Sequence, residues 1–186
     1  MRDLGKVFFS LIGGIIVFIA VFFLCLKFAP LPVAVADSPF PLEKQSVKIA
    51  LRSRISRQMQ SAPFGVNEDV LQACAHIYRE QCSICHGIPG HDSGFAKHMY
   101  PAPPQLWKKH GDHGAVGVSE DEPGFSYWIV SNGIRLTGMP SFINVLSDTQ
   151  RWQVSLLLKN ANQEQPASVT QILNAPPLPE QSADQH

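Results

Sequence analysis

The fold of this chain is decided by the stretch Cys82-Ser83-Ile84-Cys85-His86. Two thiols three positions apart can add across the two vinyl groups of one haem, and the adjacent histidine then projects toward the iron from the same turn. A thioredoxin-like redox pair would need a βαβ setting, and a zinc site would need a second ligand pair, and neither is visible in the sequence. The motif therefore predicts one haem c, attached covalently through Cys82 and Cys85 and ligated by His86.

A helix is expected to lead directly into this motif. Asn67 or Asp69 can cap its first turn, and it is predicted to run to about Gln81. One apolar face follows from side chains three and four positions apart, namely Val70, Leu71, Cys74, Ile77 and Tyr78. The predicted helix therefore buries one face and delivers the chain to the attachment motif.

The iron of such a haem needs a sixth ligand or an open site, and the best candidate is Met139. It lies in Gly138-Met139-Pro140, where glycine allows the backbone to come close to a haem and proline stiffens the loop. A thioether is a soft, neutral ligand that favours ferrous iron and raises the reduction potential. Two alternatives stay open, Met99 in a loop soon after the motif, and bis-histidine ligation through His91, His98, His110 or His113.

Residues 70–160 resemble a class I monohaem cytochrome c, the His/Met-ligated type, in its membrane-anchored bacterial form. The resemblance rests on a helix ending in Tyr78-x-x-x-Cys82, the C-x-x-C-H-G run, the Gly-Met-Pro loop and an aromatic C-terminal helix, in that order. It implies an all-α fold, with a cytochrome c-type helical domain around one haem, preceded by an N-terminal transmembrane helix.

The resemblance also implies roles for four further residues. The carbonyl of Pro104 would accept the Nδ1–H of His86 and so fix the orientation of the ring, unless this segment is only a proline-stiffened loop. Leu106 would pack on the haem face. Trp128 and its neighbours would shield a haem edge, and Arg135 either meets a haem propionate or is an ordinary surface arginine.

Two more helices are expected toward the C-terminus. The first covers 124–132 after an acidic, proline-containing start, and Gly133 is expected to close it with a left-handed cap. The second is capped by Ser147 and covers 149–159, with a buried face of Trp152, Val154, Leu156 and Leu157. In the cytochrome family the first and last helices usually cross at a glycine. Cys74 occupies that place here, so we expect it to be a structural thiol.

The N-terminus carries an uncharged run that begins at Val7 and ends at Leu26. About twenty helical residues span a hydrocarbon core of roughly 30 Å, so this run predicts a single-pass anchor in the bilayer. Arg2 and Lys6 precede it, which favours a cytoplasmic N-terminus and a periplasmic haem domain at a bacterial inner membrane. A cleaved signal peptide is the competing interpretation, because a small-x-small pattern ends at Ala36.

Between anchor and haem domain, a proline-rich linker is expected to lead into a basic helix over residues 42–60. Its apolar stripe consists of Val47, Leu51, Ile55 and Met59. The helix either packs on the domain with a solvated basic face, or lies on anionic headgroups or an acidic partner. The predicted domains are an anchor at 1–27, linker and basic helix at 28–62, a cytochrome c domain at 63–165 and a tail at 166–186, whose start can form one short helix.

Composition narrows the function. Fifteen basic and fifteen acidic residues give a net charge of zero, which argues against nucleic acid as a partner. We expect a membrane-tethered electron carrier, not an enzyme, whose haem cycles between Fe(II) and Fe(III) and whose partners are redox proteins at the membrane. The alternatives are a haem subunit of a membrane dehydrogenase or oxidase complex, and an open-site haem enzyme or gas sensor.

Overall fold

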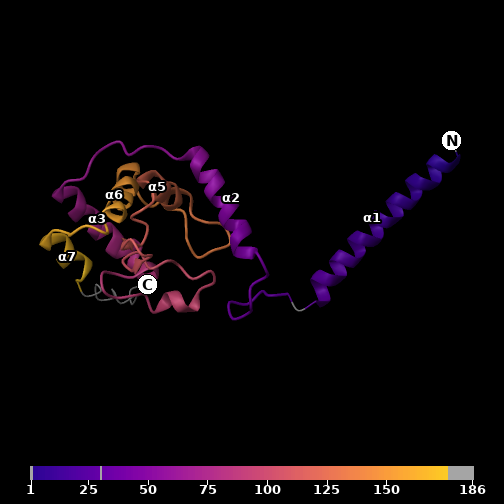
Figure 1. The fold of residues 1–186 in the computed structure, drawn as a ribbon, viewed down its shortest axis with the longest axis horizontal. Helices are drawn as coiled ribbons and strands as arrows, with labels where there is room; N and C mark the ends of the chain where they lie inside the picture. The colour runs from indigo at the N-terminus through magenta and orange to yellow at the C-terminus, as the bar shows by residue number, and fades with distance from the viewer. Residues whose placement is uncertain (1, 30, 176–186) are drawn as a thin grey trace, which may run out of the picture. The chain divides into compact units, whose positions relative to one another are not determined.

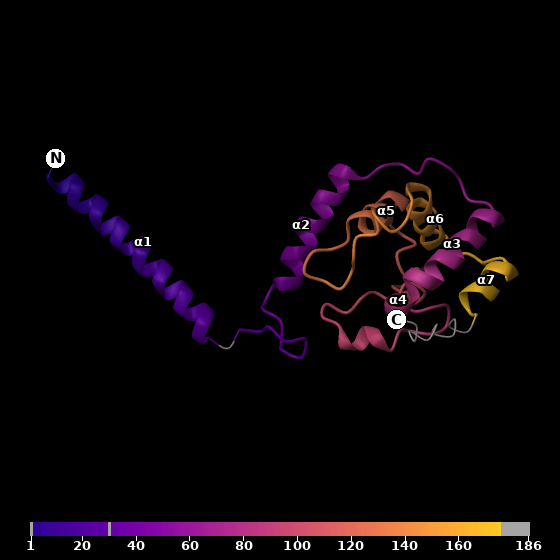
Figure 2. The ribbon, with the colours of Figure 1, turned by 180° about the vertical axis from the view of Figure 1, so that it is seen from behind.

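The computed structural model describes residues 2–29 and 31–175, and the chain divides into two compact units, Met1–Glu43 and Lys44–His186. Each unit is described by itself. Figures 1 and 2 show the ribbon from two opposite sides, with one long helix in the first unit and a group of shorter helices in the second.

The first unit is built on α1 (Arg2–Phe28). Its segment Gly5–Phe28 is long and apolar enough to cross a membrane. The expected N-terminal apolar helix is therefore present. A signal sequence at this end of a chain has the same length and composition, so the helix alone does not decide between anchor and signal.

The second unit is mostly helical, which confirms the all-α fold class. Its helices are α2 (Glu43–Gln58), α3 (Glu68–Gln81), α4 (Ser83–His86), the 3₁₀ helix η1 (Phe95–His98), α5 (Pro123–Asn132), α6 (Asp148–Lys159) and α7 (Ala167–Leu173). A short antiparallel hairpin of β1 (Lys109–His110) and β2 (Ala115–Val116) was not predicted. Gly111 and Gly114 at its turn have φ values of 66° and 70°, a conformation that glycine adopts without steric cost.

The core of this unit forms where α3 packs against α6 and α7, and where α5 packs against α6 (Figures 1 and 2). Cys74 is completely buried at the α3–α6 contact, and its Sγ donates a hydrogen bond to the carbonyl of Gln153 at 2.8 Å. Burial raises the pKa of this thiol to about 12. Cys74 therefore stays a neutral, packed thiol between the two helices.

The helix ends show why these segments are helical. The side chain of Asn67 accepts from the N–H of Val70 at 2.8 Å, and Ser147 forms a complete capping box with Gln150. Gly133 follows α5 with φ 67° and ψ −172°. Its φ is positive, as expected, but its ψ is extended, so the left-handed helical cap predicted here is wrong.

The compact unit begins earlier in the chain than the cytochrome c domain predicted at 63–165, because it includes α2. The C-terminal half of α2 packs against α5, since Ile55 is completely buried and Nε1 of Trp128 donates to Oε1 of Gln58 at 2.9 Å. The guanidinium of Arg52 also lies 5.9 Å from the ring centre of Phe125. By contrast, Val47 in the first half of α2 is 54% exposed, so only part of the predicted apolar stripe is buried.

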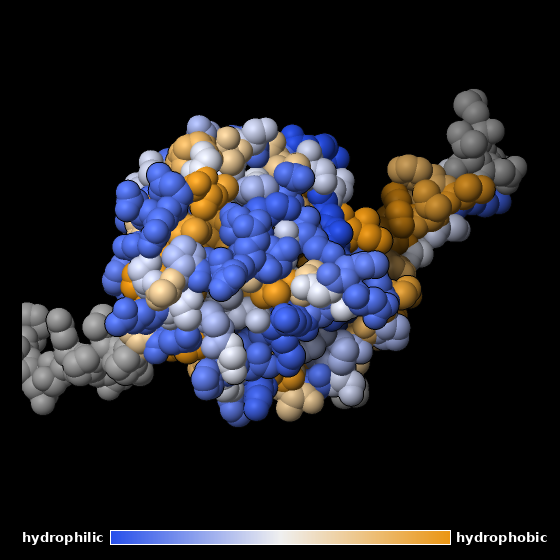
Figure 3. Space-filling model, turned by 60° about the vertical axis from the view of Figure 1, so that its left-hand side comes forward, coloured by the Kyte–Doolittle hydropathy of each residue, from blue (hydrophilic) through white to orange (hydrophobic). Residues whose placement is uncertain are grey.

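The C-terminal helix α7 likewise belongs to the packed unit, although it was predicted as part of a tail. Val169 and Leu173 are completely buried, and Arg79 donates from Nε and Nη2 to the carbonyl of Ala175 at 3.2 and 2.6 Å. The rest of the predicted tail, residues 176–186, lies outside the described residues. Figure 3 shows one face of the second unit to be mostly hydrophilic, with hydrophobic residues in small patches, as expected for a domain in water.

Candidate haem site

A cleft of about 160 Å³ opens beside the attachment turn. The lining is almost wholly apolar and includes two methionines, with Cys82, His86, Met99, Pro104, Leu106, Val118, Ile129, Val130, Ile134, Met139, Val154 and Leu158 among its members. Such a lining suits a flat, apolar group that is held by a few polar or sulfur atoms.

A smaller cavity adjoins the attachment turn and brings in the second cysteine. It is lined by Cys82, Cys85, His86 and Met139, together with neighbours that include Pro140 and Phe142. Burial raises the pKa of the Cys82 thiol to about 12, so this thiol stays protonated near neutral pH. A thioredoxin-like pair needs a thiolate, and the protonated state of Cys82 does not suit that chemistry.

The attachment turn is formed because α3 breaks at Cys82 and restarts as the single turn of α4. The N–H of Cys82 still donates to the carbonyl of Tyr78 at 2.9 Å, and the buried hydroxyl of Tyr78 donates to the carbonyl of Gly87 at 2.8 Å. Gly87 has φ 73°, and a Cβ there would lie 2.7 Å from the carbonyl oxygen of His91. Glycine is therefore needed immediately after the motif.

The ring of His86 is held by the loop that follows it. Nδ1 lies 2.8 Å from the carbonyl oxygen of Pro104, and because a carbonyl only accepts, Nδ1 carries the proton and Nε2 keeps its lone pair. The backbone N–H of Leu106 donates back to the carbonyl of His86 at 3.0 Å. Burial lowers the pKa of His86, which favours the neutral imidazole that binds metal ions.

The loop that carries Met139 is held by its own backbone and by Thr137. The carbonyl of Met139 accepts from the N–H of Ile134 at 3.1 Å, and its N–H donates to Oγ1 of Thr137 at 3.1 Å. Gly133 allows the close return of this loop, because a Cβ there would lie 2.7 Å from the backbone carbon of Pro140 and 2.8 Å from the carbonyl oxygen of Met139.

Beyond Met139, the loop is fastened to α5 and α6. The hydroxyl of Ser141 donates to the carbonyl of Ser131 at 2.6 Å. Nη1 of Arg151 donates to the carbonyls of Ile143 and Leu146 at 3.1 and 3.0 Å. These bonds hold the segment after Met139 against two helices of the core.

The structure also places the alternative ligands. Met99 lines the same cleft as Met139, so it remains a candidate on position alone. His91, His98, His110 and His113 are absent from the described lining of the cleft, where His86 is the one histidine. Among residues 2–29 and 31–175, the bis-histidine alternative therefore has no second histidine in the lining of this cleft.

Of the remaining predicted site residues, Leu106 lines the cleft with 6% of its surface exposed, whereas Trp128 and Arg135 are not among the described lining residues. The indole of Trp128 bonds to α2, while Ser126, Ile129 and Val130 line the cleft from other positions of α5. Arg135 is exposed just after α5.

Sequence reasoning missed two sets of residues. Val154 and Leu158 of α6 line the cleft, and their i,i+4 spacing on a predicted helix was a usable signal. Gln105 was also missed. Its Oε1 accepts from the N–H of Ser93 at 2.6 Å, and its Nε2 donates to the carbonyl of Cys85 at 3.2 Å. Nothing in the local pattern marks this glutamine, because its partners are distant in sequence.

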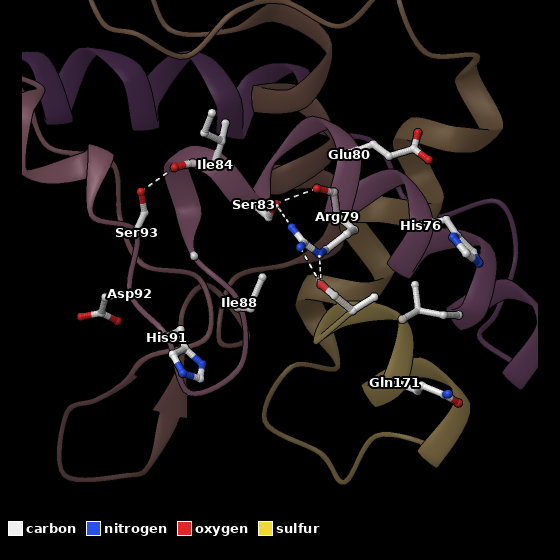
Figure 4. A pocket seen from close by; sticks show the side chains of 13 residues that line it. His76, Arg79, Glu80, Ser83, Ile84, Ile88, His91, Asp92, Ser93 and Gln171 are labelled. Atoms are coloured by element: carbon white, nitrogen blue, oxygen red, sulfur yellow. Dashed lines mark hydrogen bonds between the residues drawn. The ribbon is translucent and has the colours of Figure 1, made fainter. Parts of the chain in front are cut away.

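A second, wider groove lies on the other side of the attachment turn and shares no described residue with the cleft. Figure 4 shows its polar side chains, among them His76, Glu80, His91 and Asp92. Arg79 crosses it and donates to Oγ of Ser83 at 3.1 Å as well as to the carbonyl of Ala175 (Figure 4). These contacts have a structural role, because Arg79 links the end of α7 to the start of α4.

Comparison with known proteins gives a matching family and similar solved structures. The profile of the family described as cytochrome c oxidase, cbb3-type, subunit III matches residues 69–156. No curated protein matches this chain. A chain of the reducing HAO-like protein complex of Kuenenia stuttgartiensis is similar, with 22% identity, a TM-score of 0.43, and coverage of 55% of this chain and 49% of that chain. The present chain thus spans about half the length of that structure.

The matched segment contains both halves of the site, the attachment turn and the Met139 loop. It also contains α5 and most of α6, which line the cleft, and all of α3 except its first residue. A domain of this family implies haem c and electron transfer through it. Residues 69–156 therefore form a c-type cytochrome domain of the class I-like kind.

Proposed function

We propose that this protein is a membrane-tethered electron carrier with one haem c, attached through Cys82 and Cys85 and ligated by His86 and Met139. One observation carries the proposal: Cys82, His86 and Met139, from two segments more than fifty positions apart in sequence, line the same apolar cleft. The sequence contains a single C-x-x-C-H motif, which supports one haem.

The residues present fit this group. The apolar lining of the cleft suits a porphyrin, and both cysteines flank the adjoining cavity. His86 presents a neutral imidazole whose Nδ1 is already bonded to Pro104, as is typical of a metal-bound histidine. When bound, haem c supplies an iron that exchanges one electron between its ferrous and ferric states.

The chain's own residues then set the conditions for that exchange. Pro104 fixes the tautomer and the orientation of His86. Leu106, Val130 and Leu158 exclude water from the faces of the cleft, and a low local polarity disfavours the more highly charged ferric state. The thioether of Met139 also favours the ferrous state, so the proposed ligation raises the reduction potential.

The location follows from α1. In the proposed arrangement α1 crosses the inner membrane of a bacterium and the cytochrome domain works on the periplasmic side. A tether restricts diffusion and raises the effective concentration at membrane partners. The mass of the mature protein, purified from membranes, tests this: a chain that starts after Ala36 would contradict the tether and leave the electron carrier intact.

A second candidate is a fixed haem subunit of a membrane oxidase, and the description of the matching family favours it. The two candidates differ in their partners. Purification from membranes in mild detergent should leave a carrier largely alone. Recovery of stoichiometric membrane subunits with this chain would instead support the fixed subunit.

The ligation is tested by the visible spectrum of the ferric protein. Met139→Ala should lose the weak Met–iron band in the red, and Met99→Ala should keep it at neutral pH. A wild-type protein that is high-spin, or that binds carbon monoxide readily, would contradict a saturated iron and favour the open-site enzyme or gas sensor instead.

A further inference from the structure

We propose that Met99 is a positioning residue for Met139: its thioether side chain packs over Gly138 and restrains the loop that presents the axial sulfur. The inference rests on the proposed ligation by Met139 and assigns a function to the second methionine of the cleft. Met99 is half-buried and lines the same cleft. It lies on a segment of the chain forty positions away from Met139.

The contact itself is specific. The ε-methyl of Met99 occupies the space that a Cβ on Gly138 would need, and its sulfur lies 3.8 Å from that position. Gly138 is not among the residues with positive φ, so its backbone would accept a side chain. Among the described residues, a Cβ at position 138 would meet only Met99 within 4 Å. The side chain of Met99 is therefore the steric reason for a glycine at this position.

The segment that carries Met99 is anchored to the attachment turn. Ser93 accepts through its Oγ from the N–H of Ala96, in the first turn of η1, and donates to the carbonyl of Ile84 in α4 at 2.5 Å. The N–H of Met99 then closes η1 by donating to the carbonyl of Ala96 at 3.3 Å. Position 99 is therefore fixed relative to the turn that holds His86.

The other end of the same segment is anchored as well. Gln105 bridges the N–H of Ser93 and the carbonyl of Cys85, and Pro104 holds the ring of His86. Met99 thus connects the His86 side of the cleft with the Gly138–Met139 peptide on the opposite side. A methionine is suited to this contact because its three rotatable bonds let it fill an irregular space.

The experiment uses the full-length haem protein in detergent and measures imidazole binding to the ferric form. Imidazole displaces a weakly held axial methionine, and loss of the red band reports the displacement. Met99→Ala should keep the band without imidazole and bind imidazole about tenfold tighter, the effect of one or two lost packing methylenes. Met99→Leu keeps most of the volume and should fall between this variant and wild type.

Gly138→Ala tests the same contact from its other partner. Its new methyl displaces the end of Met99, so imidazole affinity should again rise about tenfold. In the Met99→Ala background the space is empty, and Gly138→Ala should then add less than about twofold. If Gly138→Ala raises imidazole affinity by the same factor in the wild-type and the Met99→Ala background, the proposal is overturned.

Met59→Ala is the matched control. Met59 is also a partly exposed methionine whose side chain packs against a glycine, Gly124, and it lies outside the cleft. It should leave imidazole affinity unchanged. If Met139→Ala keeps the red band, the ligation and this inference both fail; if Met139→Ala loses the band while Met99→Ala binds imidazole as wild type does, only the role of Met99 fails.

Discussion

The two sides of the cleft are held in different ways. The His86 side lies on the single turn of α4, directly after α3 ends, and its partners Pro104 and Leu106 come from the loop that follows directly. The Met139 side is a loop without helix, held by hydroxyl groups, by backbone bonds and by Arg151. We therefore expect the His86 side to be the rigid side that fixes the proposed haem, and the Met139 side to be the one whose proposed ligand is more easily displaced.

The largest effect is expected on the rigid side. A Cys82→Ala/Cys85→Ala variant should lose covalent haem completely, because no thiol remains at the motif to form a thioether. Haem staining after denaturing electrophoresis measures this. Cys74→Ala is the control, since it removes another buried thiol whose pKa is also raised to about 12, and it should keep the stain. Loss of the stain in the control would mean that folding, not attachment, is measured.

The next largest effect is expected from alanine substitutions at one glycine on each side of the cleft, Gly133 and Gly87. Gly133→Ala combines a positive φ with a clash against the backbone of the Met139 loop, at a cost of about 2–5 kcal/mol. We expect the red band to disappear while covalent haem is retained. Gly87→Ala has the same two penalties on the His86 side and should instead lower the yield of haem protein.

Gly90→Ala is the control for this pair, because Gly90 has φ 79° but nothing within 4 Å of an added Cβ. It should cost only the conformational strain of about 1–2 kcal/mol and leave the spectrum unchanged. If Gly133→Ala keeps the red band, the close return of the loop is not what places Met139.

A smaller effect is expected at Tyr78. Tyr78→Phe leaves the buried carbonyl of Gly87 without its 2.8 Å hydrogen bond, and this should lower the free energy of unfolding by about 1–2 kcal/mol. Burial raises the pKa of Tyr78 well above its ordinary value, so its hydroxyl stays a donor throughout the accessible pH range. Chemical denaturation measures the loss, and the red band should remain because the change lies on the His86 side.

The smallest effect is a pH dependence on the Met139 side. The hydroxyl of Tyr127 donates to Asp148 and holds the pKa of that carboxyl below its usual 3.8, with the guanidinium of Arg151 as a further cause. A lowered pKa in the folded state means that the interaction stabilises the protein above pH 3.8 and is lost as pH falls through the lower, folded value. Tyr127→Phe should therefore flatten the fall of thermal stability below pH 4, and an unchanged slope would contradict this.

Much of the His86 side was predictable from sequence because its contacts are local. The C-x-x-C-H spacing, the apolar face of α3 and the cap at Asn67 each depend on residues within a few positions. The placement of Met139 by Gly133 and Thr137 is nearly as local, and the loop chemistry indicated the loop although not the extended ψ of Gly133.

What sequence did not reveal depends on contacts between distant segments. Trp128 was assigned to the cofactor because it is large and aromatic, and sequence did not reveal that α2 supplies the side-chain oxygen Oε1 of Gln58 as its partner. The packing of α7 on α3 depends on Arg79 reaching Ala175, ninety-six positions away. No periodicity in either segment encodes such pairs.

The segment between His86 and Leu106 should tolerate changes in its length. It leaves His86 and returns to the same residue through Pro104 and Leu106, so it is a closed loop whose ends are already joined by hydrogen bonds. Doubling the length of such a loop costs only about 0.6 kcal/mol in closure entropy. Insertions distant from Ser93, Met99 and Gln105 should therefore be tolerated here without moving the histidine, so this loop can lengthen in evolution while the haem-binding turn stays the same.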